Sequence, residues 1–121
     1  MPKPEPEAGH ALPLPAVDLQ ILLVLAEGDL YGYAIKKAVE RESNGVLTPE
    51  IGSLYRVLAR LMDSGWVEEA SSPPHVPGPQ RGRPRRYYSV TPAGLKVARA
   101  EVKRLRQIVE SSGRIGMEGA Q

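Results

Sequence analysis

The stretch from Thr48 to Glu69 reads TPEIGSLYRVLARLMDSGWVEE, and it decides the fold. Its apolar residues recur at steps of three and four, which places them on one face of an α-helix with 3.6 residues per turn. Thr48 is predicted to cap this helix, and Pro49 suits its first turn. Gly65 can adopt the left-handed conformation that ends a helix, so Trp66 is predicted to begin an extended segment.

The outward side of this helix carries small and basic residues, namely Gly52, Ser53, Arg56 and Arg60. Small residues permit close approach to a duplex, and arginine offers two parallel donors to guanine or phosphate. The first turns of a DNA recognition helix have this character. A solvated amphipathic helix remains an equally good interpretation of this segment alone.

Composition limits the classes of function. A chain of 121 residues is one small domain with tails, and a core without Phe would gain from a second copy. The net charge of +2 argues only weakly for a polyanionic partner. The absence of Cys excludes disulfides, thiolate nucleophiles and Cys-type zinc sites.

Catalysis, metal binding and membrane insertion are not expected. His10 and His75 both lie in Pro-rich stretches, and the central carboxylates provide no nucleophile with an adjacent base. We therefore predict no cofactor and no enzyme activity. The longest apolar run is far short of the ~20 residues that span a bilayer. With no secretion signal at the N-terminus, a cytoplasmic protein is expected.

The N-terminal part is predicted to be a tail followed by a buried helix. Residues 1–15 contain five prolines and are expected to be flexible, although Leu12 and Leu14 could pack on the fold. From Ala16 to Glu27 the chain reads as a helix that is apolar nearly all round, ended by Gly28. Such a helix is buried on several sides, here by its own domain and by a partner chain.

A second amphipathic helix precedes the recognition segment. Its apolar face comprises Tyr31, Ala34, Ile35, Ala38 and Val39, and it is predicted to end at Asn44 and Gly45. Two helices joined by a short turn form a helix-turn-helix. Lys36 and Lys37 would then lie near the DNA backbone, although a lysine pair on a helix is more often merely solvated.

After the recognition helix, a hairpin is predicted from two strands, Trp66 to Ala70 and Arg85 to Val90, with a Pro- and Gly-rich loop between them. This arrangement is typical of a wing, and an ordinary hairpin is the alternative. Four arginines lie within six residues of this loop, without an acid: Arg81, Arg83, Arg85 and Arg86. An extended arginine-rich segment can enter a minor groove, and residues 80–84 resemble the core of AT-hook peptides.

The last helix is predicted from its Thr91 cap and Pro92 to about Ser111. The spacing of Leu95, Ala98, Val102, Leu105 and Val109 matches a coiled-coil seam. The outside is assigned to Lys96, Arg99, Lys103 and Arg106, with Glu101 and Glu110 as counter-charges. The seam could pack on the first helix or on a second copy, and we favour dimerisation. Residues 112–121 are expected to be frayed.

Several separated motifs occur in a fixed order: residues 31–35 (YGYAI), Gly52-Ser53-Leu54-Tyr55 with Leu58 and Leu61, residues 82–88 (GRPRRYY), and residues 91–94 (TPAG). Over residues 17–110 the chain thereby resembles short PadR-type winged-helix transcriptional regulators. The resemblance implies a homodimeric DNA-binding repressor whose third helices enter successive major grooves. Family members often have Pro where this chain has Arg56, and the wing loop here is longer. Some relatives bind aromatic effectors, but this last helix has no aromatic residue, so a small-molecule effector is unsupported.

The predicted fold is mainly α with a small β-hairpin wing, a winged helix-turn-helix that dimerises through its N-terminal and C-terminal helices. Its parts are a tail (1–15), the DNA-binding domain (16–91, wing about 66–90), a dimerisation helix (92–111) and a second tail (112–121). We expect sequence-specific binding to an inverted repeat in double-stranded DNA. The alternative is a winged-helix protein interaction module.

Roles can be assigned to the candidate DNA-binding residues. Ser53 and Arg56 are the expected base readers, and Tyr55 is a packing residue whose hydroxyl could reach a phosphate. Arg60 and the wing arginines are expected to clamp phosphates. The full set is Lys36, Lys37, Thr48, Gly52, Ser53, Tyr55, Arg56, Arg60, Arg81, Arg83, Arg85 and Arg86.

Overall fold

Four α-helices and three short strands make up residues 11–70 and 86–115, the part of the chain that this computed structural model describes. In chain order they are α1 (Ala16–Ala26), β1 (Leu30–Tyr31), α2 (Gly32–Glu42), α3 (Ile51–Asp63), β2 (Val67–Glu69), β3 (Tyr87–Val90) and α4 (Pro92–Ser112), followed by a 3-10 turn, η2 (Gly113–Ile115). None of the helices in this part is long and apolar enough to cross a membrane.

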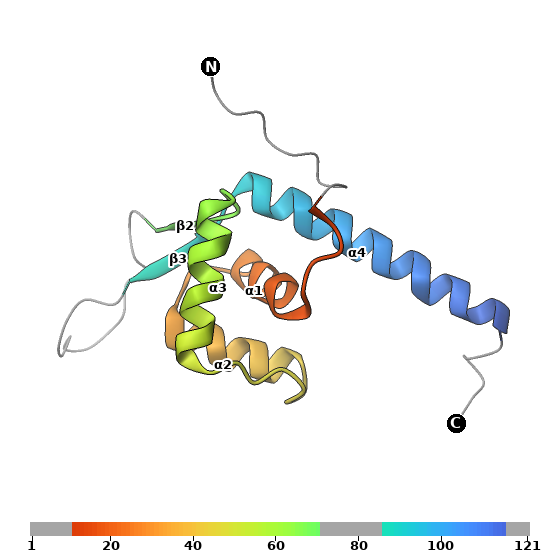
Figure 1. Cartoon of the computed structure of the whole chain (residues 1–121), viewed down its shortest axis with the longest axis horizontal. Helices are drawn as coiled ribbons and strands as arrows, with labels where there is room; N and C mark the ends of the chain where they lie inside the picture. The colour runs from red at the N-terminus through yellow and green to blue at the C-terminus, as the bar shows by residue number, and fades with distance from the viewer. Residues whose placement is uncertain (1–10, 71–85, 116–121) are drawn as a thin grey trace, which may run out of the picture.

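Helix α1 lies at the centre of the fold, with α2, α4 and β3 packed against it (Figure 1). Ile21, Leu22 and Leu25 are almost completely buried. Their burial on several sides explains why this helix has apolar residues nearly all round, as predicted. Leu23 is the exception, because it is exposed at the surface.

The strands form a three-stranded antiparallel sheet in the order β1-β3-β2. Pairing of Val67 with Val90 confirms the predicted hairpin. Strand β1 is a correction, since the sequence placed Tyr31 in the second helix. Two residues are too few for a period-2 pattern, and β1 exists because β3 pairs with it from much later in the chain. The rings of Tyr31 and Tyr87 meet edge to face, with centroids 5.7 Å apart.

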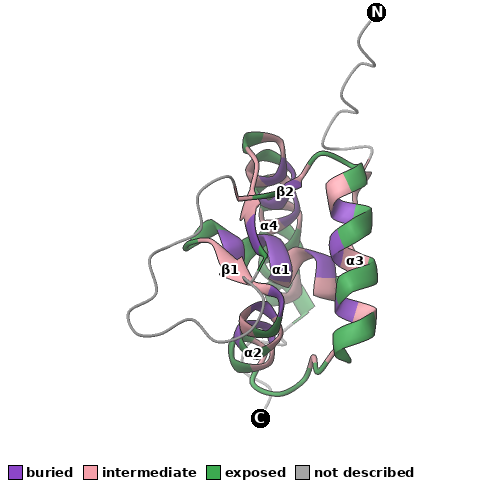
Figure 2. Cartoon of the chain, turned by 90° about the vertical axis from the view of Figure 1, so that its left-hand side faces the viewer, coloured by how far each residue is buried: buried purple, intermediate pink, exposed green. Residues whose placement is uncertain are grey.

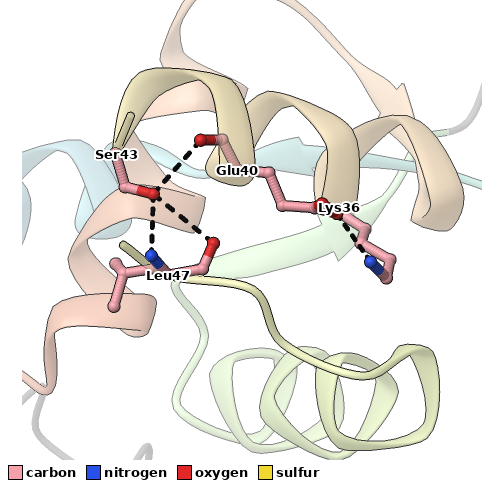
Figure 3. Close-up of polar contacts among 4 residues, drawn as sticks. All are labelled: Lys36, Glu40, Ser43 and Leu47. Carbon is pink, nitrogen blue, oxygen red and sulfur yellow. Dashed lines mark hydrogen bonds and ion pairs between the residues drawn. The ribbon is translucent and has the colours of Figure 1, made fainter. Parts of the chain in front are cut away.

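The turn between α2 and α3 is held by one hydroxyl (Figure 3). The Ser43 hydroxyl accepts a hydrogen bond from the Leu47 amide at 2.9 Å. Its proton faces two carbonyl oxygens, those of Glu40 at 3.3 Å and Leu47 at 3.4 Å. Between them, Asn44 and Gly45 adopt positive φ angles of 53° and 78°, which confirms the predicted end of the second helix.

Helix α3 begins later than predicted. Its N-cap is Glu50, which is extended (φ −68°, ψ 150°), and no side chain caps the helix. Thr48 is therefore not the cap. Pro49 thus precedes the helix instead of opening its first turn. The predicted end is confirmed, because Gly65 has a φ of 78° directly after the last turn.

The buried face of α3 consists of Leu54, Leu58 and Leu61. These residues pack into the common core with α1 and α2. Ile51 and Tyr55 belong to the same apolar pattern in sequence, but both remain exposed. The periodicity thus identified the buried side of α3 correctly, but it included two residues near the N-terminus of the helix that are exposed.

Residues 11–15, the described end of the tail that was expected to be flexible, are part of the fold, as the sequence had allowed for Leu12 and Leu14. Leu12 and Leu14 pack against the core, and the Leu14 amide donates a 2.7 Å hydrogen bond to Glu101. Glu101 was predicted to lie outside, yet it is buried and bound by Arg104 at 2.5 and 3.1 Å. The helical pattern of α4 could not show that the segment before α1 covers the turn that contains Glu101. Residues 1–10 lie outside the described residues.

Helix α4 has the predicted cap, because the Thr91 hydroxyl accepts a hydrogen bond from the Gly94 amide at 3.0 Å. The same hydroxyl donates to the Gly65 carbonyl at 2.6 Å, which ties α4 to the end of α3. The helix continues to Ser112 and into η2, so residues 112–115 are regular rather than frayed. Residues 116–121 lie outside the described residues.

Candidate nucleic-acid interface

The first turns of α3 expose small and basic side chains, as the sequence predicted. In Figure 2 the outer side of α3 is exposed along its length. The Arg56 guanidinium donates a 3.0 Å hydrogen bond to the Ser53 hydroxyl, so these two polar groups form one exposed unit. Gly52 precedes them, and a Cβ placed there would meet no other atom within 4 Å. This backbone is open to a ligand.

Tyr55 joins α3 to the start of α2. The residue is 47% exposed, and its hydroxyl lies over Gly32, where an added Cβ would overlap it. Any larger residue at position 32 would have to displace the ring. The predicted packing role of Tyr55 thus has a definite partner, and half of the ring remains accessible at the surface.

The two lysines of α2 have different surroundings. Lys36 binds Glu40 at 2.6 Å, and this hydrogen bond is the main reason that the pKa of Glu40 lies below its usual value. Lys37 is exposed, and its ammonium lies 5.4 Å from the centroid of the Tyr33 ring. Tyr33, itself half exposed, was not among the predicted site residues. The motif of residues 31–35 (YGYAI) contains Tyr33 and was the available signal.

Arg60 is not the free outward cation that the sequence suggested. Its guanidinium donates to both carboxylate oxygens of Asp18, at 2.5 and 3.1 Å. This hydrogen bonding raises the pKa of Arg60. Asp18 was missed by sequence reasoning, although it is the one charged residue in α1. An acid inside an apolar helix needs a cation, and that requirement could have identified the pair.

Arg86 is the wing arginine that the structure describes. It donates a 3.1 Å hydrogen bond to Glu69 across the β2–β3 pair, and it lies 5.9 Å from the centroid of the Tyr88 ring. The bond to Glu69 is the main reason that the pKa of Arg86 is raised. Arg81, Arg83 and Arg85 lie outside the described residues. Thr48, also a predicted site residue, is exposed in the turn before α3.

A second surface of interest is an apolar groove between α1 and α4. We call it the α1–α4 groove, and its lining residues are Leu19, Leu23, Ala26, Leu95, Ala98, Arg99, Val102, Lys103, Leu105, Arg106, Val109 and Glu110. It includes all five residues of the predicted seam. Ala98 is buried within the chain itself, whereas Val109 is 65% exposed. The C-terminal part of α4 extends beyond the other helices (Figure 1).

Within the described residues, no cluster of three or more His, Cys, Asp or Glu side chains could hold a metal ion. The ionisable side chains with shifted pKa values occur in ion pairs or in the sheet. The two surface features described above are therefore the exposed face of α3 and the apolar α1–α4 groove.

Residues 21–100, more than half of the chain, match the model of the transcriptional regulator PadR-like family. The chain belongs to this family of transcriptional regulators. The matched range includes the helix-turn-helix of α2 and α3, the strands β2 and β3, and the first turns of α4.

Solved PadR-like structures have the same winged-helix fold. A transcriptional regulator from Clostridium thermocellum is 27% identical, with a TM-score of 0.65 over 83% of this chain and 89% of that one. A PadR family regulator from Clostridium difficile is 24% identical, with a TM-score of 0.66 over 84% of this chain and 98% of that one. Bacillus subtilis PadR, solved in complex with operator DNA, is 20% identical, with a TM-score of 0.59 over 73% of this chain and 47% of that one.

Among curated proteins, the chain is similar to an uncharacterised 37.1 kDa protein of a Streptomyces fradiae transposon. The two are 37% identical over 95 residues, which cover 78% of this chain. This PadR-like chain spans about a quarter (24%) of the length of that relative.

Proposed function

We propose that this PadR-like chain represses transcription by binding an inverted repeat in double-stranded DNA as a homodimer. The carrying observation is the open, small-residue start of α3. Glycine in a helix costs up to about 1 kcal/mol relative to alanine, and no neighbour in the described fold requires one at position 52. A helix that must approach base edges closely supplies the reason.

The chemistry beside Gly52 fits this role. Arg56 presents a guanidinium suited to guanine or phosphate, and Ser53 can exchange its bond to Arg56 for one to DNA. Lys37 and Tyr33, on the adjacent helix, would lie against the phosphate backbone. PadR of Bacillus subtilis shares the fold and was solved with operator DNA, which supports DNA binding as the function of this fold here.

The dimer would form over the α1–α4 groove. A helix whose last turns expose Leu105, Ile108 and Val109 has apolar surface that the described chain does not cover. Pairing two copies about a two-fold axis would bury this surface and present two α3 helices on one side of a duplex.

The test is selection of bound duplexes from random and genomic DNA by the purified chain, followed by sedimentation of the complex. We expect an inverted repeat, two chains per site and an affinity that falls steeply with salt. Recovery of no preferred sequence, together with salt-independent binding, would contradict the proposal and favour a protein interaction module. A reporter gene placed behind the selected site then distinguishes repression from activation.

A further inference from the structure

The ion pair between Arg60 and Asp18 connects two functional parts of the chain. Asp18 lies in the first turn of α1, and Arg60 lies in the last turn of α3. Their two hydrogen bonds, at 2.5 and 3.1 Å, have the bidentate geometry that fixes both distance and orientation. A single point charge could not fix the orientation.

Burial makes this pair obligatory. Asp18 is 1% exposed and lies in a helix whose other buried residues are apolar. Removing Arg60 would leave the Asp18 carboxylate uncompensated in the interior, which is strongly destabilising. The Arg60 side chain is about half exposed, so its own desolvation costs less free energy than that of Asp18. It contacts Asp18 from the surface side of the fold.

The packing of the helices explains what the pair controls. Helix α3 packs mainly on α2 and β2, whereas α1 packs mainly on α2, α4 and β3. In the described residues, Arg60 and Asp18 make the polar contact that joins α3 to α1 directly. In the proposed dimer α1 belongs to the interface and α3 reads the DNA.

We infer that Arg60 is a positioning residue: with Asp18 it sets the placement of α3 relative to α1, and thereby the half-site spacing that the dimer selects. This inference rests on the proposed function. It assigns the pair a part in specificity, because the distance between the two α3 helices must match the repeat of the duplex.

The rival role for Arg60 is a phosphate clamp, and the two roles predict opposite effects of Asp18→Asn. If Arg60 clamps phosphate, loss of the Asp18 charge frees the guanidinium, so DNA binding strengthens and its salt dependence steepens. If Arg60 positions α3, the same change loosens the helix and weakens binding to a correctly spaced site. Each half-site then still binds as before.

The experiment compares the wild-type chain, Asp18→Asn and Arg60→Lys. Each is used to select duplexes from a random pool, and each is titrated against the wild-type-selected duplex and against a duplex that carries one half-site. Arg60→Lys keeps a cation beside Asp18 but loses the bidentate geometry, so it tests positioning with less risk to folding. Glu101→Gln is the matched control, since it breaks another buried ion pair that does not contact α3.

We expect both Asp18→Asn and Arg60→Lys to bind the full site about tenfold more weakly, comparable to one mismatched base pair. Their affinity for the single half-site should stay within about twofold of wild type, and their selected spacings should shift or broaden. Glu101→Gln should retain the wild-type spacing.

Unchanged spacing in both variants, whatever their affinity, would overturn the inference while leaving the proposed function intact. Equal losses on full and half sites would also overturn it, because they would indicate a general structural defect. If the wild-type chain selects no duplex, the proposed function fails first, and the inference fails with it.

Discussion

Arg56 is exposed on α3, and its guanidinium is held 3.0 Å from the Ser53 hydroxyl. This bond pre-orders a long side chain, so less rotamer freedom is lost when the guanidinium binds a base. Where many PadR-type proteins have Pro, this chain has Arg56, whose guanidinium would donate to guanine under the proposed function. The identity of this one side chain should therefore matter for the sequence that the protein reads.

We expect Arg56→Ala to weaken binding to the selected duplex by about 1–3 kcal/mol, the value of a bidentate base contact. Fluorescence anisotropy on the selected and on a scrambled duplex measures it. Lys96→Ala removes the same charge from an exposed position of α4 and serves as the control. Equal losses in the two variants would mean that Arg56 contributes only charge.

Gly94 lies in the first turn of α4, where this helix packs closely against the backbone of Trp66, the residue before β2. A Cβ at this position would overlap the Trp66 carbonyl and press on Val90. We expect Gly94→Ala to lower the free energy of unfolding by about 1–3 kcal/mol, because an overpacked backbone contact has to move apart. Urea unfolding followed by the fluorescence of Trp66, the single tryptophan, measures the loss.

Gly52→Ala is the matched control for that prediction. Its Cβ would enter open space, so we expect stability to rise by about 0.5 kcal/mol through better helix propensity. Under the proposed function the same methyl group weakens DNA binding. A stabilised variant with unaltered DNA affinity would show that close approach at Gly52 is not needed.

Among the elements, α4 has a divided role. Its first turns pack within the chain, where Gly94, Val97 and Ala98 are buried. Its last turns expose apolar residues that continue the α1–α4 groove. The heptad pattern in sequence treats both halves alike. The structure separates the half of α4 that belongs to this chain's core from the half whose apolar residues remain exposed.

Val109→Asp should shift the chain towards a monomer, because a carboxylate would be buried without a partner in the proposed interface. Sedimentation at micromolar concentration measures the change, and unfolding should be little affected at a position already exposed in the single chain. Gln107→Asp adds the same charge to α4 outside the groove lining and should remain dimeric. A dimeric Val109→Asp chain would place the interface elsewhere.

The same comparison explains which elements the sequence could predict. Helices α1 and α4 have eleven or more residues and strong local signals, so their bounds were predicted to within one or two residues. The prediction that Tyr31 lies in the second helix was wrong, since it lies in β1, and so was the predicted start of α3. Strand β1 depends on a tertiary pairing with β3, and the start of α3 involves too few residues to produce a periodic pattern.

At the scale of the whole molecule, two buried acids connect segments that are far apart in the chain. Asp18 joins α1 to α3, and Glu101 joins α4 to the segment before α1. The Arg104 hydrogen bond, followed by the Leu14 amide, lowers the pKa of Glu101 despite its burial. The folded state therefore favours the ionised form of this carboxylate.

This dependence predicts how stability changes with pH. A carboxyl whose pKa is depressed in the folded state stabilises the fold fully above its ordinary pKa of about 4.3, and this contribution is lost as the pH falls through the folded value. Glu101→Gln should therefore be less stable than wild type at pH 7, and the difference should narrow below about pH 4.3. Thermal unfolding from pH 7 to pH 3 measures it. A difference that stays constant would mean that Glu101 is not the titrating group.

The sequence by itself determined the order of the four helices and the hairpin, the winged helix-turn-helix class, and the outward position of Gly52, Ser53 and Arg56. These follow from local periodicity and from caps and turns, which neighbouring residues decide. Only the tertiary structure decided that Arg60 pairs with Asp18, that Glu101 is buried and that β1 joins the sheet. The physical reason is that burial and ion pairing depend on which distant segment lies beside a side chain, and spacing along the chain does not record that.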